Sequence, residues 1–349
     1  MAPNARDSTG VLSEEDAEIT PEQIEEVHKT SKNRHLPLVW RDVIKFAVLH
    51  ALGFYGFYLM FTSARIWTSV LVFINYHLGI LGITAGAHRL WAHKAYKARW
   101  PLKLFLAYIQ TLAFQFDIIF WAKYHRVHHK YTETDADPHN AKRGFFYSHM
   151  GWTMVKKNPE FETRCNEIDL SDLYSDPIVN FQYKYYYQIL FVVFLVVPTF
   201  IPMYFWNETF VNAFCLNLSR YLLSLHCTWL VNSAAHLYGN KPYDKSLYSS
   251  ENFWVTILVN GEGWHNYHHA FPWDYKASEL GIYSTNMTAF FIDAMAKLGL
   301  AYDLKSVAPE VVKRRVERTG DGSHPIWGWG DKDQSEEDKR SALISHKDT

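Results

Sequence analysis

Four long apolar runs limit most strongly how this chain can fold. Each is long enough for a helix that crosses a hydrocarbon core of roughly 30 Å. They cover approximately residues 43–62, 67–87, 187–205 and 209–231. Links of a few residues join the runs in pairs, so we predict two transmembrane hairpins with both chain termini on one side of the membrane. The alternative, four buried helices of a soluble protein, is disfavoured because all four runs approach spanning length.

Charged and polar residues orient these spans. The fourth run contains Asn212, Arg220 and His226, and polar residues in a membrane segment usually face the interior of a helix bundle. Lysine and arginine are in excess in residues 28–41, 94–103, 123–157 and 305–318. By the positive-inside rule, these segments lie on the cytoplasmic side.

A fifth apolar stretch, residues 102–121, is interrupted by Gln110, Gln115 and Asp117. We interpret it as a re-entrant or interfacial helix, because a full crossing would separate histidine motifs that flank it.

The domain boundaries follow from the same pattern. Residues 1–40 are polar and lack the apolar core of a signal peptide, so we expect a flexible cytosolic arm. Residues 41–330 form one domain, whose cytosolic cap consists of residues 88–186 and 232–330, and residues 331–349 form a polar tail. The expected fold class is an all-α integral membrane protein with four transmembrane helices in two hairpins and a helical cap.

Charge and cysteine content exclude several classes of protein. The formal net charge of −1 argues against nucleic-acid binding. Cys165, Cys215 and Cys227 lack the C-x-x-C spacing of zinc fingers and iron–sulfur sites. An odd number of cysteines without a signal peptide also argues against a disulfide framework.

Nine of the 18 histidines stand in motifs outside the apolar runs. The spacing H-x-x-H-H occurs twice, at 125–129 and 265–269, and three- and four-residue spacings share one face of a helix. Nine imidazoles exceed what one four- to six-coordinate ion uses, so we predict two ions, for which iron, copper, zinc and nickel all suit imidazole. The candidate ligands are His88, His93, His125, His128, His129, His236, His265, His268 and His269.

Two pairs of candidate ligands need separate interpretation. Five α-helical residues separate His88 from His93, an offset of about 140°, so these side chains are expected to point at different ions or to straddle a helix end. Asn232 and His236 form an i, i+4 pair at the end of the fourth run. Such a pair usually caps or packs a helix, but its position beside the histidine motifs favours ligation.

Carboxylates that orient the imidazoles are expected nearby. The sequence offers Glu133, Asp135, Asp137 and Glu262 without deciding among them. The remaining histidines lack mutual spacing and are interpreted as ordinary surface or core residues: His28, His35, His50, His77, His139, His149, His226, His324 and His346.

Three strings, HRLWAH at 88–93, HRVHH at 125–129 and HNYHH at 265–269, together resemble the histidine boxes of membrane acyl-CoA desaturases, the stearoyl-CoA desaturase family. The flanking strings GITAGAH at 82–88, ETDADPHN at 133–140, NSAAH at 232–236 and GEGWH at 261–265 agree as well. The resemblance extends from about residue 37 to 330 and is strongest to insect members.

The resemblance implies four membrane helices and a cytosolic cap that holds two iron ions, with the nine histidines as ligands and Asn232 bound through a water. It implies O2-dependent removal of two hydrogens from a saturated fatty acyl-CoA, usually between carbons nine and ten. Electrons would come from cytochrome b5 and its NADH-dependent reductase in the endoplasmic reticulum membrane. Because the His-Pro-Gly-Gly string of fused cytochrome b5 domains does not occur in the sequence, the donor is expected to be a separate protein.

The family's substrate contacts also have counterparts. Residues matched to nucleotide contacts are Lys123, Trp152, Lys156, Lys157 and Trp229, those matched to the tunnel kink are Gln115, Trp121 and Thr228, and those matched to the closed tunnel end are Tyr76 and Ile80. A branched Ile80 at the tunnel end predicts a preference for chains of about sixteen carbons or fewer, since a buried methylene contributes about 0.8 kcal/mol only where space exists. The alternative is that Ile80 packs against a neighbouring helix.

The chain departs from the family at Phe116, Lys123 and Tyr124, where relatives carry Asn, Arg and Asp, and at Asp42, where they carry Asn. Lysine keeps the charge of arginine but loses its two-pronged hydrogen bonding. We therefore expect acyl binding to be retained and CoA recognition to be weakened or altered.

Three other functions remain open. A hydroxylase on the same scaffold would release an alcohol in place of an alkene, and an inactive relative would bind metal or lipid without turnover. A metal transporter is disfavoured because such proteins generally place ligands within the spans or in repetitive loops.

Overall fold

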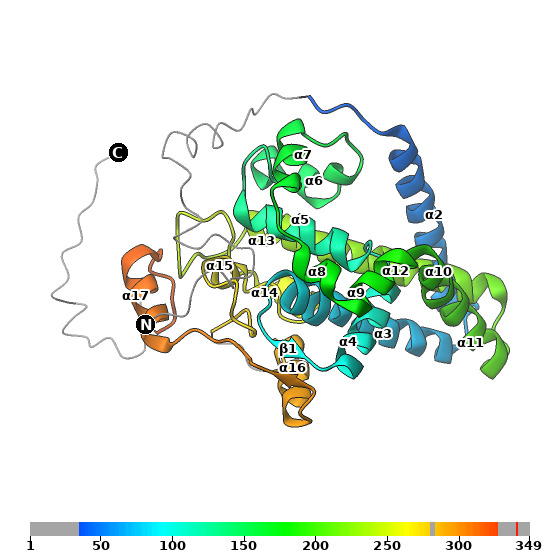
Figure 1. The fold of residues 1–349 in the computed structure, drawn as a ribbon. Helices are drawn as coiled ribbons and strands as arrows, with labels where there is room; N and C mark the ends of the chain where they lie inside the picture. Colours follow the sequence, from blue (N-terminus) through cyan, green and yellow to red (C-terminus); the bar gives the residue numbers. More distant parts are fainter. Residues whose placement is uncertain (1–34, 280–282, 327–339, 341–349) are drawn as a thin grey trace.

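The structure, a computed structural model, describes residues 35–279, 283–326 and 340. The predicted arm at 1–40 and tail at 331–349 lie almost entirely outside the described residues. Helices dominate the described chain (Figure 1). The two strands, β1 (Lys97–Ala98) and β2 (Ala301–Tyr302), form one short antiparallel pair. The predicted all-α class is therefore confirmed.

Three helical segments in the described residues are long and apolar enough to cross a membrane. The first is α2 (Trp40–Thr62), and the second is α3 (Ile66–Leu81) with its π-helical continuation η2 (Gly82–Ala92). The third comprises α10 (Tyr186–Leu190), the π-helical η5 (Phe191–Val196) and α11 (Val197–Trp206). They correspond to the first three predicted runs.

The fourth predicted span, α12 (Phe210–Asn232), is as long as α2 but is not among these apolar segments. Asn212 and Arg220 are buried within the bundle, as predicted for polar residues in a membrane segment, and His226 is half-buried. Asn217 Nδ2 donates to Phe194 O at 2.7 Å, and Arg220 donates to Asn217 Oδ1 at 3.0 Å. Because α12 packs along α2 and α3, its polar residues need not meet lipid.

The two links of the predicted hairpins contact each other at one end of the bundle. Glu208, in the link between α11 and α12, accepts hydrogen bonds from Arg65 N at 2.7 Å and from Thr68 Oγ1 at 2.6 Å. Arg65 belongs to the link between α2 and α3. The two hairpins therefore have the same direction.

The fifth apolar stretch is broken into α4 (Trp100–Ala113) and α5 (Ile118–Lys130), which meet at 81°. Phe116, between them, has a positive φ of 65°, and Gln110 Nε2 holds its carbonyl at 2.8 Å. Asp117 then begins α5 by accepting from Phe120 N at 2.8 Å. This bend fits the predicted re-entrant segment, although a broken span has the same geometry.

Short helices form the cap, which lies mainly to the left of the long helices α3, α11 and α12 in Figure 1, with α6 and α7 toward the top and α16 at the bottom. They are η3 (Ala141–Arg143), α6 (Phe145–His149), η4 (Gly151–Thr153), α7 (Pro159–Asn166), α8 (Ser171–Ser175), α9 (Pro177–Lys184), α13 (Ala234–Leu237), α14 (Phe253–Leu258), α15 (His265–Ala270), α16 (Met287–Lys297) and α17 (Pro309–Thr319). The histidine motifs lie on η2, α5, α13 and α15, at the junction of cap and bundle.

Candidate metal centre and substrate cavity

All nine predicted histidine ligands come together in two groups. The first group consists of His88, His93, His125, His129 and His268, and the second of His128, His236, His265 and His269. Within each group, one nitrogen from every imidazole lies within 4.8 Å of the others. The prediction of two ions thus has a counterpart in two clusters of potential ligands.

Each H-x-x-H-H motif contributes to both groups. On α5, His125 and His129 belong to the first group and His128 to the second. On α15 the division is reversed, because His268 joins the first group while His265 and His269 join the second. Residues i and i+4 share a helix face, and the histidine between them points to the neighbouring group.

The expectation that His88 and His93 point at different ions was wrong, because both belong to the first group. The alternative was correct, since His88 lies within η2 and His93 directly follows its last residue. His93 N donates to His88 O at 3.0 Å, the i to i+5 hydrogen bond of a π-helix. A π turn brings residues five apart onto the same face, which α-helical geometry does not.

The nitrogens in each group approach one another closely. His268 Nε2 lies 2.9 Å from both His88 Nε2 and His129 Nε2, and His265 Nε2 lies 3.0 Å from His236 Nε2 and 3.1 Å from His269 Nε2. One nitrogen cannot share a proton with two such neighbours at once. Lone pairs that converge in this way fit a bound cation.

The protonation of the histidines also fits a metal centre. Burial lowers the pKa of six of them well below the usual value: His93, His125, His129, His265, His268 and His269. Neutral imidazole is the form that binds metal.

Three of the four suggested carboxylates contact the outer nitrogens of candidate ligands. His88 Nδ1 lies 2.8 Å from Glu262 Oε2, and His236 Nδ1 lies 2.7 Å from Glu133 Oε1. Asp137 lies 3.0 Å from the Nδ1 atom of His128. These contacts place N–H at Nδ1 and leave the Nε2 lone pair directed into the group. Asp135 is not one of the three.

Glu262 also binds a buried arginine. Arg89 Nη2 donates to Glu262 Oε1 at 2.8 Å, and the arginine is 1% exposed. Burial raises the pKa of the Glu262 carboxyl, but the charge of Arg89 and the hydrogen bonds from His88 and Arg89 outweigh burial and bring this pKa to about 2. The carboxylate is therefore charged and orients His88.

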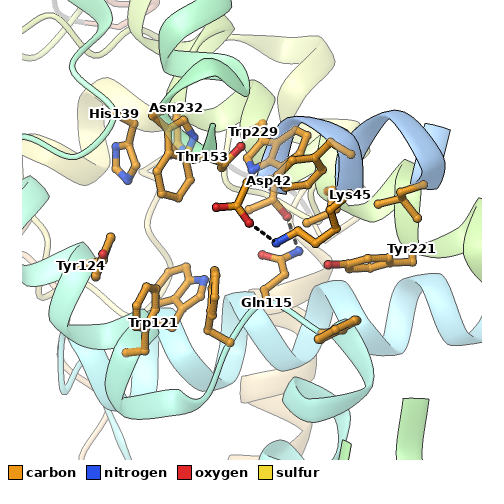
Figure 2. A pocket seen from close by; sticks show the side chains of 18 of the residues that line it. Asp42, Lys45, Gln115, Trp121, Tyr124, His139, Thr153, Tyr221, Trp229 and Asn232 are labelled. Carbon is orange, nitrogen blue, oxygen red and sulfur yellow. Dashed lines mark hydrogen bonds and ion pairs between the residues drawn. The ribbon is translucent and has the colours of Figure 1, made fainter. Parts of the chain in front are cut away.

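His139 is a site residue that the sequence interpretation missed. Its ring centroid lies 4.6 Å from that of His128, and its Nδ1 lies 3.4 Å from Asp137. It also lines a cavity, close to Asn232, as Figure 2 shows. The string ETDADPHN, which contains His139, was a signal that could have identified it.

A cavity of about 500 Å³ lies beside the first histidine group and reaches His125 and Asn232. Six of the ten predicted substrate contacts line it: Gln115, Trp121, Trp152, Lys157, Thr228 and Trp229. Trp121 stacks on His125 with ring centroids 4.9 Å apart. Gln115 Nε2 donates to Thr228 Oγ1 at 2.9 Å, joining opposite walls where the kink was predicted.

Aromatic rings and one buried lysine form the part of the wall where the sequence is expected to depart from the family. The rings of Phe116, Phe120 and Tyr124 stack along α5 at centroid distances of 4.2 and 4.1 Å. Lys157 Nζ lies 4.5 Å from the centroid of the Trp152 ring, and burial lowers the pKa of this lysine to about 8.

Charges at the same wall are partly neutralised within the protein. Asp42 Oδ1 lies 2.9 Å from Lys45 Nζ (Figure 2), so Asp42 offsets a cation that would otherwise face the cavity. The other predicted nucleotide contacts, Lys123 and Lys156, are outside the lining.

Tyr76 and Ile80 also lie outside the cavity lining. Ile80 is fully buried and packs in a cluster with Cys227 and Val255. Tyr76 donates to Leu258 O at 2.7 Å. This is the packing given as the alternative for Ile80, and its role in chain length stays a prediction.

Comparisons with known proteins agree with these features. Residues 64–291 match the family model described as fatty acid desaturase. An acyl-CoA Delta-9 desaturase of Acheta domesticus is 53% identical, with both chains covered completely, and an acyl-CoA Delta12-desaturase of the same insect is also 53% identical, over 98% of this chain and 97% of its own. Stearoyl-CoA desaturase 2 of Mus musculus is 52% identical over 82% of this chain and 80% of its own. The chain therefore belongs to the fatty acid desaturase family, and within it to the membrane acyl-CoA desaturases.

Proposed function

We propose that this acyl-CoA desaturase binds two iron ions in its two histidine groups and introduces a delta-9 double bond into a saturated fatty acyl-CoA. The observation that carries the proposal is the convergence of nine imidazoles beside a largely apolar cavity. The similarity to a Delta-9 desaturase supports the position of the bond. Relatives named Delta12 and Delta(11) desaturases are 53% and 48% identical, so the position is the first property to measure.

Bound iron would supply the O2-activating chemistry that oxidises an unactivated carbon–carbon single bond. The residues of the chain do the rest by position. Trp121 stacks on His125, which also lines the cavity, and gives the acyl chain a flat wall. The Gln115 to Thr228 hydrogen bond fixes the bend of the cavity, which determines which carbons lie beside the histidines. Mostly apolar walls exclude water from the chain.

We further propose that electrons come from cytochrome b5 and its NADH-dependent reductase, and that the enzyme lies in the endoplasmic reticulum with both termini in the cytosol. The excess of lysine and arginine at 94–103 and 123–157 supports this orientation. A basic surface there would suit an acidic electron donor.

The test is expression in a yeast strain that lacks its own desaturase. Gas chromatography with mass spectrometry of double-bond adducts then reports chain length and bond position together. We expect a C16 or C18 fatty acid with a delta-9 double bond. A hydroxylated product would identify a hydroxylase, and stable iron-loaded protein without any product would identify an inactive relative.

Chain length tests the role of Ile80. If Ile80 limits the tunnel, Ile80→Ala shifts the product ratio toward C18 by up to about 15-fold, because two more methylenes gain room at about 0.8 kcal/mol each. The same yeast assay measures the ratio, and exposed Ile44→Ala on α2 is the control. An unchanged ratio in Ile80→Ala would assign this residue to packing alone.

CoA recognition is tested with the double variant Phe116→Asn and Lys123→Arg, which leaves the packed Tyr124 ring in place. One charge-assisted hydrogen bond from arginine to phosphate contributes about 1.5–3 kcal/mol. We therefore expect the KM for acyl-CoA to fall about tenfold while kcat stays constant. Single variants separate the two positions. A KM equal to that of the unmodified enzyme would show that the departures do not weaken CoA binding.

A further inference from the structure

Three histidines outside the metal centre form a hydrogen-bonded array across three helices. His50 on α2 lies 3.0 Å from His226 on α12, Nε2 to Nε2, and His226 Nδ1 lies 3.0 Å from Nε2 of His149 on α6. At one end, His50 Nδ1 lies 2.7 Å from Phe46 O. At the other end, His149 Nδ1 lies 3.0 Å from Ser233 Oγ. We call His50, His226, His149 and Ser233 the histidine array.

The array lacks one proton when its imidazoles are neutral. It contains five contacts, including the bond of 2.8 Å from Ser233 Oγ to the backbone carbonyl of Trp229. Three neutral imidazoles and one hydroxyl provide only four hydrogens. The terminal carbonyls of Phe46 and Trp229 provide none. One contact must therefore fail, or one further proton must bind.

The position of Ser233 determines what the additional proton changes. Without the additional proton, each imidazole donates its one hydrogen toward the Phe46 end of the array, and the Ser233 hydroxyl must donate to His149 Nδ1. The hydroxyl then no longer donates to Trp229 O. With the additional proton, His149 Nδ1 donates to Ser233 Oγ, and the hydroxyl donates to Trp229 O, in the last turn of α12. Protonation is thus coupled to the end of α12 through a single hydroxyl.

The last turn of α12 forms part of the substrate cavity. Trp229 and Asn232 both line the cavity, and Figure 2 shows their side chains at its edge. The Trp229 ring also contacts the array, with its centroid 5.3 Å from that of His226 and 5.8 Å from that of His149. A change in the array therefore reaches the cavity through both the backbone and the ring of Trp229.

We propose that the histidine array binds one proton and thereby positions Trp229 and Asn232 for acyl-CoA binding. The three histidines are positioning residues, because the structure places none of them in the cavity lining. This inference rests on the proposed function, since it takes acyl-CoA to be the ligand of the cavity.

The surroundings of the array determine the direction of its pH dependence. The residues in ring or hydrogen-bond contact with its imidazoles are uncharged: Phe46, Phe54, Phe145, Trp229 and Ser233. The titratable groups nearest along the same helices are Asp42 and Lys45, which pair with each other, and Tyr55, Tyr147, Arg220, Tyr221 and Cys227. Arg220 donates to Asn217 Oδ1 and Leu112 O. Burial lowers the pKa of His149. The proton is therefore bound at acidic pH and released as pH rises toward neutrality.

Calorimetry measures the coupling without turnover. The full-length protein in nanodiscs is titrated with palmitoyl-CoA between pH 5.5 and 8 in two buffers of different ionisation enthalpy, which gives the number of protons taken up on binding. A fivefold coupling corresponds to a maximum uptake of about 0.4 proton. We expect this uptake, beyond that of the His149→Asn variant, at acidic pH, with a decline toward zero at neutral pH. The phosphates of the ligand contribute equally to both proteins and cancel.

The His149→Asn variant is chosen because its amide nitrogen can replace Nδ1 and donate permanently to Ser233. We expect its affinity for palmitoyl-CoA to be independent of pH and equal to the acidic-pH affinity of the unmodified protein. His149→Ala, which cannot donate, should bind about fivefold more weakly at acidic pH, as expected for one hydrogen bond. Equal affinities and equal proton uptake in all three proteins would overturn the inference.

Two controls keep the result interpretable. His50→Gln removes the imidazole at the Phe46 end of the array and should reduce proton uptake in the same way, so the test does not depend on the folding of a His149 variant. Product analysis in yeast is independent of the binding measurement. An enzyme that makes an alkene without proton linkage refutes the array alone, and linked binding without any product refutes the proposed desaturation alone.

Discussion

Replacing His268 by alanine is expected to reduce iron content and to abolish product formation. His268 is 1% exposed, and its Nε2 approaches both His88 and His129 at 2.9 Å. Alanine removes a candidate ligand from the middle of the first group. The buried space that it leaves contains no other side chain from the described residues that could replace the imidazole. We expect less than about 1% of the alkene made by the unmodified enzyme, since the loss of even an outer partner of a metal ligand typically costs 10–100-fold.

The measurement combines iron analysis of the purified protein with product analysis in yeast. His35→Ala is the matched control, because this histidine is exposed and lies before α2. It should retain both iron and activity. Alkene formation by His268→Ala at the level of the control would refute the assignment of the first group as the iron site.

Replacing Glu262 by alanine should have the second largest effect, because this residue serves both stability and the metal centre. Its carboxylate neutralises Arg89, which also donates to the carbonyls of Tyr275 and Lys276 at 2.8 and 2.9 Å. Removing one partner of a buried ion pair costs about 3–5 kcal/mol. His88 also loses the acceptor for its Nδ1 proton at 2.8 Å.

We therefore expect Glu262→Ala to unfold at a temperature several degrees lower and to lose about 10–100-fold in iron affinity. Glu262→Gln is the matched variant, since it keeps the size and one acceptor but removes the charge, and its losses should be smaller. Thermal unfolding and iron titration in detergent measure both effects. Unfolding temperatures that agree for all three proteins would contradict a stabilising role of this ion pair.

Local features of the chain were readable from the sequence. The length and hydropathy of an apolar run are properties of one continuous segment, so they predict a membrane-spanning helix without any knowledge of tertiary contacts. Three of the four runs appear as apolar helices. The spacing of His125, His128 and His129 reports a shared helix because i, i+3 and i+4 geometry is local. The two H-x-x-H-H motifs could thus be assigned to one centre before any tertiary contact was known.

Other features depended on backbone geometry that the sequence did not reveal. The π-helical turn between His88 and His93 arises where η2 packs against α4, and a Cβ at Gly82 would lie 2.3 Å from Gln110 N. The α-helical spacing assumed from the sequence predicted that His88 and His93 point in different directions, whereas both belong to the first group. The fourth run, predicted as a span, is too polar to count among the apolar helices, and only the structure shows that neighbouring helices satisfy its polar groups.

The sequence by itself determined the family, the candidate ligands and the apolar segments, because each depends on residues close together in the chain. Only the tertiary structure decided which partners those residues meet. Glu133 reaches His236 across 103 residues, and His50 reaches His226 across 176 residues. His139 and the histidine array looked ordinary because their neighbours are distant in sequence. Hydrogen bonds and charges act over a few ångströms in space, so folding, and not spacing along the chain, selects their partners.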